Sequence, residues 1–457
     1  MKALSLFGAA LLTSTVLCAP SALARQADTA QTSEEIADVV TVRGEFIPEP
    51  QRRTAQVASF VTSEDLQRSG DGNAAIALTR LSGLSIVSGR FAYVRGLGDR
   101  YAAALLNGSP LPSPEPLRRI VPLDLFPSEV LDGVAVQKTY SANYGAEFGG
   151  GLIALNTLRR PAEPFLNFSG SIGYNTVTTG ETGLIHRGSD TDWTGYDRGY
   201  RDIPGPLADV IRNNQTLNSL SPAQLEAVSE SVVIPNLLVV QSMDLHPDYS
   251  VSSSGGYAFD LGGFDIGLVG AAGFDAGWSI ENAQRQRVRG DVLGTNLTSQ
   301  LTSYDAVTNG LASVTAERGD HVVGATVFYV HSTRKDTQLT RGEDFNAQGG
   351  RPIYRETTGW FERELGMFQL TGQHAFGNLE ARWRGSISQA TRQTPFLQEL
   401  TRLEQANGDI AFTSAARYEI QFTDLTDDLS NFGGELLYTF NLPGSRELVL
   451  TVGADRT

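Results

Sequence analysis

From residue 164 onward, apolar side chains recur at every second position, a period that indicates strands rather than helices. The first run carries Leu166, Phe168, Ile172 and Tyr174, with asparagine and serine among the intervening residues. The same alternation returns in residues 249–261, 264–274, 379–388, 432–442 and 448–452. Strands with one apolar face and one polar face lie between two different environments. We therefore predict that residues 161–457 form an antiparallel sheet of about nine strands.

Short turns and long polar stretches alternate between these runs. The short turns lie at residues 262–263, 317–320, 377–378 and 443–445, and the long stretches span residues 176–246, 279–301, 337–358 and 391–428. A transmembrane β-barrel has this asymmetry, with short turns on one side of the membrane and long loops on the other. The alternative, a soluble β-sandwich, has loops of more even length. The pattern favours a barrel, with a small helix expected at residues 222–232.

Residues 1–24 have the features of a secretory signal peptide. Lys2 is followed by an apolar run at residues 3–17 and by the small-residue pattern Ala22-Leu23-Ala24. The run is too short for a membrane-spanning helix, and no later apolar run reaches that length. We therefore expect an exported chain that is either soluble or a membrane β-barrel. Cys18 is the only cysteine, so the sequence predicts no disulfide framework.

The charge balance and the motif content argue against several function classes. The chain has 36 basic and 51 acidic residues, a formal net charge of −15, whereas nucleic-acid-binding surfaces are basic. Its five histidines show no ligand spacing. The sequence has no nucleophile elbow, phosphate loop or kinase signature. We expect no enzyme, no catalytic residues, no cofactor, no metal and no nucleic-acid partner.

Residues 85–157 have a different sequence pattern, with short apolar runs separated by glycine, asparagine and proline. Such runs predict short strands joined by tight turns. Upstream, residues 57–61 predict a strand and residues 62–65 the start of a helix. Asp71 is expected to cap a second helix. The sequence thus predicts a compact module of strands and short helices at residues 46–160.

Four short motifs follow one another in this module. They are Val94-Arg95-Gly96, Leu106-Asn107-Gly108, residues 128–134, and Gly149-Gly150-Gly151 with the apolar run after it. Their order and spacing resemble the plug domain of TonB-dependent outer-membrane receptors, which has an arginine–glycine strand, a hairpin turn, a Glu-Val strand and a glycine-rich turn. Asp132 departs from the pattern, because the family has lysine or arginine before the glycine of the third motif.

The resemblance implies a plug domain inside a barrel of roughly 22 strands. The expected fold class is mainly β, a partial transmembrane antiparallel β-barrel with an N-terminal α+β plug domain. Because about nine strands cannot close such a barrel, we expect a truncated chain with less than half of it. The expected domains are a signal peptide at 1–24, a periplasmic arm at 25–45, a plug at 46–160 and an incomplete barrel at 161–457.

A short apolar patch interrupts the polar arm. It consists of Asp38, Val39, Val40, Thr41 and Val42. An extended segment of this kind can add a strand to the exposed sheet edge of another protein. The resemblance implies that this patch is the TonB box, which pairs with a TonB-type energy-transducing protein in the periplasm. The alternative is an ordinary first strand of the plug.

Two loops of the plug supply candidate substrate contacts. In the family, the loops after the arginine–glycine strand and after the hairpin turn rise toward the outside. The matching residues here are Gly98, Asp99 and Arg100, and Ser113, Pro114 and Glu115. Prolines at every second position from residue 110 to residue 116 stiffen the second loop, which can alternatively be a rigid connector. Arg95 can alternatively be structural, paired with a carboxylate of the barrel.

The resemblance implies a receptor in the outer membrane of a Gram-negative cell, surrounded by outer-membrane lipid. It would actively take up a scarce extracellular nutrient, such as a siderophore-bound iron, cobalamin or an oligosaccharide. The alternative from another class is an exported, soluble, β-rich binding protein or adhesin. Fractionation separates the two, since a barrel stays with the detergent-extracted outer membrane.

Overall fold

The structure is a computed structural model, and it describes residues 58–69, 73–87, 91–97, 101–112, 123, 126, 128, 131–139, 149–161, 163–232, 241–344, 352–405, 407–411, 416–443 and 446–457. All of these residues belong to one compact unit. None of the helices found among them has the length and apolar character needed to cross a membrane.

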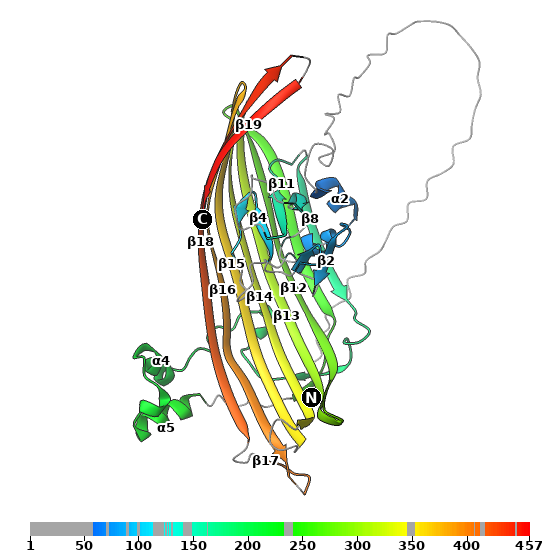
Figure 1. Cartoon of the computed structure of the whole chain (residues 1–457), viewed down its shortest axis with the longest axis vertical. Helices are drawn as coiled ribbons and strands as arrows, with labels where there is room; N and C mark the ends of the chain where they lie inside the picture. The colour runs from blue at the N-terminus through cyan, green and yellow to red at the C-terminus, as the bar shows by residue number, and fades with distance from the viewer. Residues whose placement is uncertain are drawn as a thin grey trace, which may run out of the picture. The chain divides into compact units, whose positions relative to one another are not determined.

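One large antiparallel sheet dominates the described chain (Figure 1). Its strands are β8 (Phe165–Gly173), β11 (Asp248–Leu261), β12 (Phe264–Arg289), β13 (Val292–Arg318), β14 (His321–Asp344), β15 (Pro352–Phe376), β16 (Leu379–Glu404), β17 (Ile410–Ala411), β18 (Arg417–Leu442) and β19 (Arg446–Arg456). Their order is β8-β11-β12-β13-β14-β15-β16-β18-β19, and β17 pairs with β16. This sheet confirms the predicted mainly β fold, part of an antiparallel barrel accompanied by a plug.

The strands extend well beyond the alternating runs of the sequence. The prediction of long polar loops at residues 279–301, 337–358 and 391–428 was wrong for most of these positions. β12 continues to Arg289, and β13 begins at Val292. These stretches carry polar side chains on both faces, which removes the period-two signal while the backbone hydrogen bonds of the ladder continue.

The first long polar stretch does leave the sheet, and we call its described residues, 174–232 and 241–247, the outer insertion. It contains β9 (Thr182–Ile185) and β10 (Gln241–Asp244), which pair antiparallel, and the helices α4 (Gly205–Arg212) and α5 (Pro222–Ser231). The predicted helix at residues 222–232 is therefore present, and Ser221 caps it through a reciprocal capping box with Gln224. The α4 helix was not predicted.

A smaller sheet forms the centre of the N-terminal module. Its order is β1-β6-β7-β4-β5. The strands are β1 (Ala58–Thr62), β6 (Leu131–Gln137), β7 (Gly151–Thr157), β4 (Ala102–Leu106) and β5 (Ser109–Pro110). β4 and β7 run parallel, and the other pairs are antiparallel. A separate hairpin joins β2 (Leu84–Val87) to β3 (Phe91–Val94).

Two short helices cover this smaller sheet. They are α2 (Ser63–Ser69), opened by hydrogen bonds between Thr62 and Asp65, and α3 (Ala74–Leu78). The prediction that Asp71 caps the second helix was wrong. Asn73 is the cap, because it directly precedes the first helical residue and its side chain accepts from the Ile76 backbone N–H at 3.0 Å.

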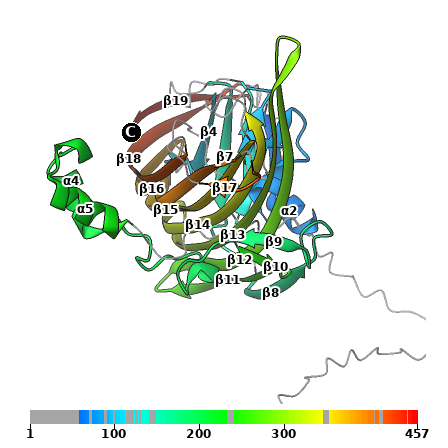
Figure 2. The same cartoon turned by 90° about the horizontal axis from the view of Figure 1, so that it is seen from below.

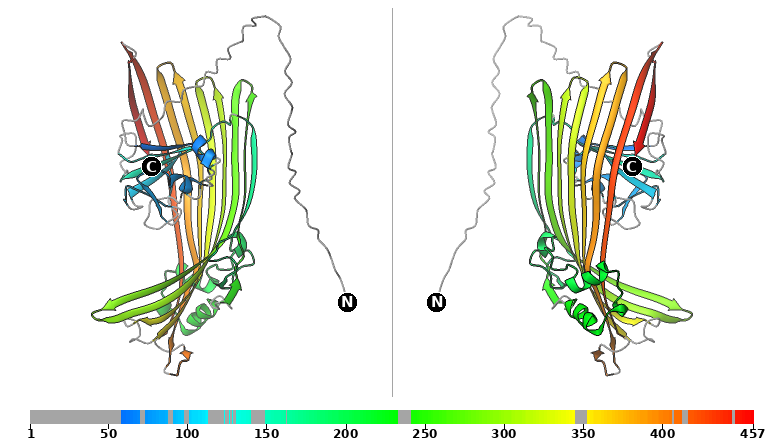
Figure 3. Two further views of the ribbon diagram at one scale, coloured as in Figure 1. Left: turned by 90° about the vertical axis from the view of Figure 1, so that its right-hand side faces the viewer. Right: turned by 90° about the vertical axis from the view of Figure 1, so that its left-hand side faces the viewer.

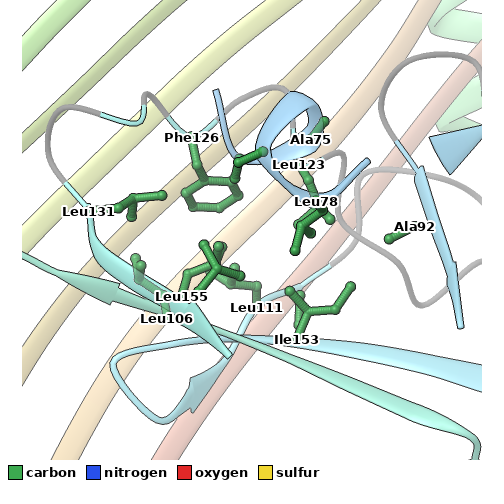
Figure 4. Packing of buried hydrophobic residues seen from close by; sticks show 14 of the residues in the cluster. Ala75, Leu78, Ala92, Leu106, Leu111, Leu123, Phe126, Leu131, Ile153 and Leu155 are labelled. Atoms are coloured by element: carbon green, nitrogen blue, oxygen red, sulfur yellow. The ribbon is translucent and has the colours of Figure 1, made fainter. Parts of the chain in front are cut away.

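The core of the module lies between the α3 helix and the smaller sheet (Figure 4). Its fully buried side chains include Leu78, Leu106, Phe126, Ile153 and Leu155. Burying one such side chain stabilises the fold by about 1.5–3 kcal/mol. The same cluster continues into the large sheet through Val269, Leu311, Phe328, Val330, Leu365, Met367 and Ala390. The module therefore packs against one face of the large sheet.

The alternation of side chains gives the large sheet two distinct faces. On β15, Leu365, Met367 and Gln369 contact the module, so Phe368 and Leu370 lie on the opposite face. We call the first the inner face and the second the outer face. Figure 3 shows the smaller sheet on one side of the large sheet and the outer insertion on the other.

Candidate functional site

The hairpin between β4 and β5 turns at Asn107 and Gly108. Their φ angles are +48° and +86°, as in the two-residue turns that asparagine–glycine pairs favour. The backbone N–H of Asn107 donates to the Leu155 carbonyl at 2.8 Å. Its side-chain oxygen accepts from the Thr157 backbone N–H at 2.8 Å. These bonds join the hairpin to β7, so the second and fourth sequence motifs lie side by side.

The same asparagine reaches the large sheet. Its Nδ2 donates to Oε1 of Gln369 on β15 at 3.0 Å. The Gln369 Nε2 donates in turn to the Leu106 carbonyl at 3.0 Å and to the Ser109 hydroxyl at 2.8 Å. Gln369 is only 1% exposed. We call Asn107, Ser109 and Gln369 the latch, because their buried hydrogen bonds join the hairpin to the inner face.

An aromatic contact holds the module to the same face. Phe126 stacks on Phe328 of β14, with ring centroids 4.6 Å apart and planes within 7°. Both rings are buried. Stacking of this kind contributes about 0.5–1.5 kcal/mol beyond the burial of the rings. The latch and this stack together give the contact both a polar and an apolar component.

A cavity of about 510 Å³ lies beside the latch, between the hairpin and the inner face. Its lining is polar and includes five charged residues, Asp132, Arg159, Arg382, Arg384 and Glu435. Arg159 donates to the Gln373 side chain at 3.1 Å, and Arg384 lies 3.7 Å from Glu435. Charged groups around a cavity of this size are suited to hold water or a small polar molecule.

The arginine–glycine motif and the glycine-rich turn also meet. Arg95 and Gly96 form a turn with φ angles of +55° and +72°. A Cβ atom added at Gly151 would clash with the Val94 side chain, and one added at Gly150 would clash with Leu97. Glycine is therefore required where these two segments pass each other.

On the outer face, exposed apolar side chains form a band across the strands. Its register is continuous, since Val327 pairs with Phe368 and Phe368 with Ile387. We define the apolar band as Leu166, Phe168, Tyr257, Leu268, Val314, Val327, Phe368, Leu370, Ile387, Phe432 and Leu436. Soluble monomers rarely expose an apolar patch that extends this far.

Polar residues mark both limits of the apolar band. At one limit Arg318 pairs with His321, and at the other His331 pairs with Glu364. On β12, the outer-face positions between these limits run from residue 264 to residue 274. A tilted strand needs about 9–11 residues to cross a bilayer. The band therefore has the height of a membrane.

Aromatic residues gather at the second limit. Trp278 and Tyr304 lie with ring centroids 4.7 Å apart, and Tyr249 and Phe274 lie 6.0 Å apart. Tryptophan and tyrosine are enriched at membrane–water interfaces, where one end of the ring is apolar and the other is wet. This cluster gives the band the boundary expected of a membrane-facing surface.

Several predicted residues lie outside the described part of the chain. They are residues 1–24, the candidate TonB box Asp38–Val42, and the candidate substrate contacts at residues 98–100 and 113–115. Sequence reasoning also missed Gln369. It lies 262 residues from Asn107, in a strand whose apolar alternation is interrupted by polar residues, and no local sequence pattern distinguishes it from them. The buried charges around Arg201 in the outer insertion, described below, were missed for the same reason.

A module latched to the inner face of an antiparallel sheet, with an apolar band on the outer face, is the arrangement that plugged membrane barrels have. Comparison with protein families adds the family: residues 50–152 match the TonB-dependent Receptor Plug Domain. This match confirms the resemblance found in the sequence, for the module at residues 50–152. A search of curated proteins finds no match.

Solved structures of low sequence identity are similar to the chain. FpvA of P. aeruginosa, bound to a heterologous pyoverdine, is 12% identical and has a TM-score of 0.36 over 88% of this chain and 52% of its own. The ferric yersiniabactin uptake receptor FyuA of Yersinia pestis is 11% identical, with a TM-score of 0.33 over 87% of this chain and 68% of its own. The RagAB peptide importer in the open-open state is 9% identical, with a TM-score of 0.38 over 88% and 55%. The chain thus spans about half to two thirds of the length of these proteins.

Proposed function

We propose that this protein is an outer-membrane receptor that imports a scarce nutrient with energy from a TonB-type partner. The observation that carries the proposal is the match of residues 50–152 to the TonB-dependent receptor plug. The latch supports it, since a plug must be held against the barrel wall until it is displaced. No enzymatic activity belongs to this proposal.

The apolar band supports placement in a membrane. In a bilayer every backbone polar group needs an internal partner, and only helices and closed barrels meet this requirement. The ladder of the large sheet is continuous across the band from β8 to β19, so the strands between these two edges have their backbone partners inside the sheet. The alternative of a soluble binding protein or adhesin is disfavoured by Phe368 and Ile387, which are 42% and 61% exposed.

The domain limits and contacts follow from the same proposal. Residues 1–24 serve as the export signal, 25–45 as the periplasmic arm, 46–160 as the plug and 161–457 as barrel wall. The segment Asp38–Val42 pairs with the TonB-type protein by strand addition. The plug loops at residues 98–100 and 113–115 contact the nutrient, which belongs to the ferric siderophore, cobalamin or oligosaccharide class.

Uptake by cells that depend on the full-length receptor tests the proposal, with each of the three nutrient classes supplied separately. Val40→Pro removes a backbone donor from the coupling segment. It is expected to abolish uptake and leave nutrient binding at the cell surface unchanged. Val40→Ala retains the donor and is the matched control. Normal uptake by Val40→Pro, or no uptake of any class by the unmodified receptor, contradicts the proposal.

A further inference from the structure

β9 of the outer insertion lies against β13 and β14 of the large sheet, whereas α4 and α5 project away from the sheet (Figure 2). The Leu184 backbone N–H donates to the Thr302 hydroxyl at 2.9 Å, and the Tyr304 hydroxyl donates to the Trp193 carbonyl at 2.7 Å. Thr302 and Tyr304 share the face of Val314, a member of the band. The insertion therefore covers the continuation, beyond the band, of the face on which the band is exposed.

Contacts on β14 show how close the insertion comes to the band. The Gly195 carbonyl accepts from His331 Nε2 at 2.8 Å and from the Thr333 hydroxyl at 2.5 Å. The Tyr196 ring stacks on the His331 ring, with centroids 4.0 Å apart. His331 marks the polar limit of the band, so the part of the insertion around Gly195 and Tyr196 lies at that limit.

A buried cluster of charges fixes the insertion in this position. Arg201 is 1% exposed and binds Asp192 through two hydrogen bonds of 2.9 and 2.7 Å, and also binds Asp197. Its guanidinium lies 4.2 Å from the centroid of the Trp360 ring on β15. Lys335 on β14 binds Asp192 at 2.7 Å. Breaking such a pair leaves a buried charge uncompensated, which is strongly unfavourable.

The ionisation of this cluster agrees with its geometry. Burial would raise the pKa of the Asp192 carboxyl, but hydrogen bonds and charge from Arg201 lower it below its ordinary value. Burial raises the pKa of the Asp197 carboxyl despite the same arginine. Two acidic and two basic side chains therefore meet in one largely buried cluster, which fastens the insertion to the sheet.

Large apolar side chains of the insertion remain exposed at this level. Tyr174 is 73% exposed, Val177 is 63% exposed and Trp193 is 61% exposed. Tyr174 follows Gly173, which pairs with Asp248, and Asp248 accepts from the Trp278 backbone N–H at 2.9 Å. The exposed residues thus lie level with the aromatic cluster that marks the boundary of the band.

We propose that the outer insertion rests on the lipid headgroups of the outer leaflet, with Trp193 and Tyr174 at the boundary between headgroups and acyl chains. This proposal rests on the proposed membrane function. Its support is the continuity with the apolar band and the amphipathic rings at the level where that band ends. The insertion then sets the depth of the barrel, because its buried charges cannot enter hydrocarbon.

Depth-dependent quenching tests the proposal in the full-length protein, reconstituted in bilayer nanodiscs on a background without other cysteines. Trp193→Cys carries a bimane label, and separate lipids carry a nitroxide on the headgroup, at acyl position 5 or at acyl position 12. We expect strongest quenching at residue 193 from the headgroup and position-5 probes. A label at Phe368→Cys, in the band, should be quenched most by the position-12 probe.

A label at Gln286→Cys, twelve residues beyond Phe274 on β12, serves as the water-exposed control and should show little quenching. Quenching at residue 368 without quenching at residue 193 overturns this inference and leaves the membrane function standing. No lipid quenching at residue 368 overturns the membrane function itself. If the label at residue 193 is shielded from aqueous iodide but is not quenched by the lipid probes, a protein partner covers it. That result also overturns the inference.

A second variant tests the buried charges. Arg201→Gln, introduced with the label at residue 193, removes the cation that Asp192 and Asp197 share. We expect lipid quenching at residue 193 to fall to the level of the Gln286 control. Unchanged quenching shows that the cluster does not position the insertion and overturns the role assigned to it. The label at residue 368 reports whether the barrel remains in the membrane.

Discussion

Replacing Gln369 by leucine should loosen the plug. Leucine has nearly the volume of glutamine but no polar atoms, so the Asn107 amide and the Ser109 hydroxyl lose their partner on β15. A buried polar group without a partner costs about 1–3 kcal/mol. Ser109 is fully buried, whereas Asn107 also borders the cavity and can recruit water. We therefore expect a loss of about 2–3 kcal/mol from plug attachment.

A loss of this size raises the population of detached plug about 30- to 150-fold. The leak of a small hydrophilic dye from proteoliposomes that contain the full-length receptor should increase by a similar factor. Gln373→Leu is the matched control, since it lies on the same face of β15 and removes two hydrogen bonds that are not fully buried, one accepted from Arg159 and one donated to Glu380. We expect less than about a threefold change for that variant.

The outcome distinguishes two accounts of plug attachment. A leak unchanged by Gln369→Leu, in a receptor that keeps its heat-modifiable folded band on a gel, would show that apolar packing around Phe126 and Phe328 alone holds the plug. The reasoning from the latch would then be refuted. Equal leaks from Gln369→Leu and Gln373→Leu would refute it as well. The loss of plug attachment would then not depend on how deeply the removed hydrogen bonds are buried.

Two further variants test other parts of the structure. Burial lowers the pKa of His186 well below its usual value, and the charges of Lys335 and Arg201 lower it further. A depressed pKa means that docking of the outer insertion is fully stable above about pH 6.5 and weakens as the pH falls below it. Relative to its cleavage of an unfolded substrate at the same pH, trypsin should cleave the insertion faster at pH 5.5 than at pH 7.5, and a pH effect that persists in His186→Gln would contradict this assignment. Gly151→Ala places a methyl group against Val94 and should destabilise the plug by about 1–3 kcal/mol; an unchanged melting temperature would show that the two segments can separate.

Local patterns were sufficient to predict most strands and several turns. Period-two alternation predicted β11 and β12, and glycine pairs or charged turn residues marked the hairpins between strands. The Asn107-Gly108 turn was also predictable, because few residues adopt two successive positive φ angles. These features depend on residues close together in the chain. The sequence alone therefore determined the element types and the plug motifs.

The tertiary structure decided the features that depend on distant partners. Gln369 is one polar residue among many, and only the register of β15 places it against Ser109, 260 residues away. The outer insertion has the composition of a solvated loop. Asp192 and Arg201 are buried because Lys335 and Trp360 meet them on the sheet. Whether a polar side chain is solvated or buried depends on the surface that covers it, and that surface exists only in the folded chain.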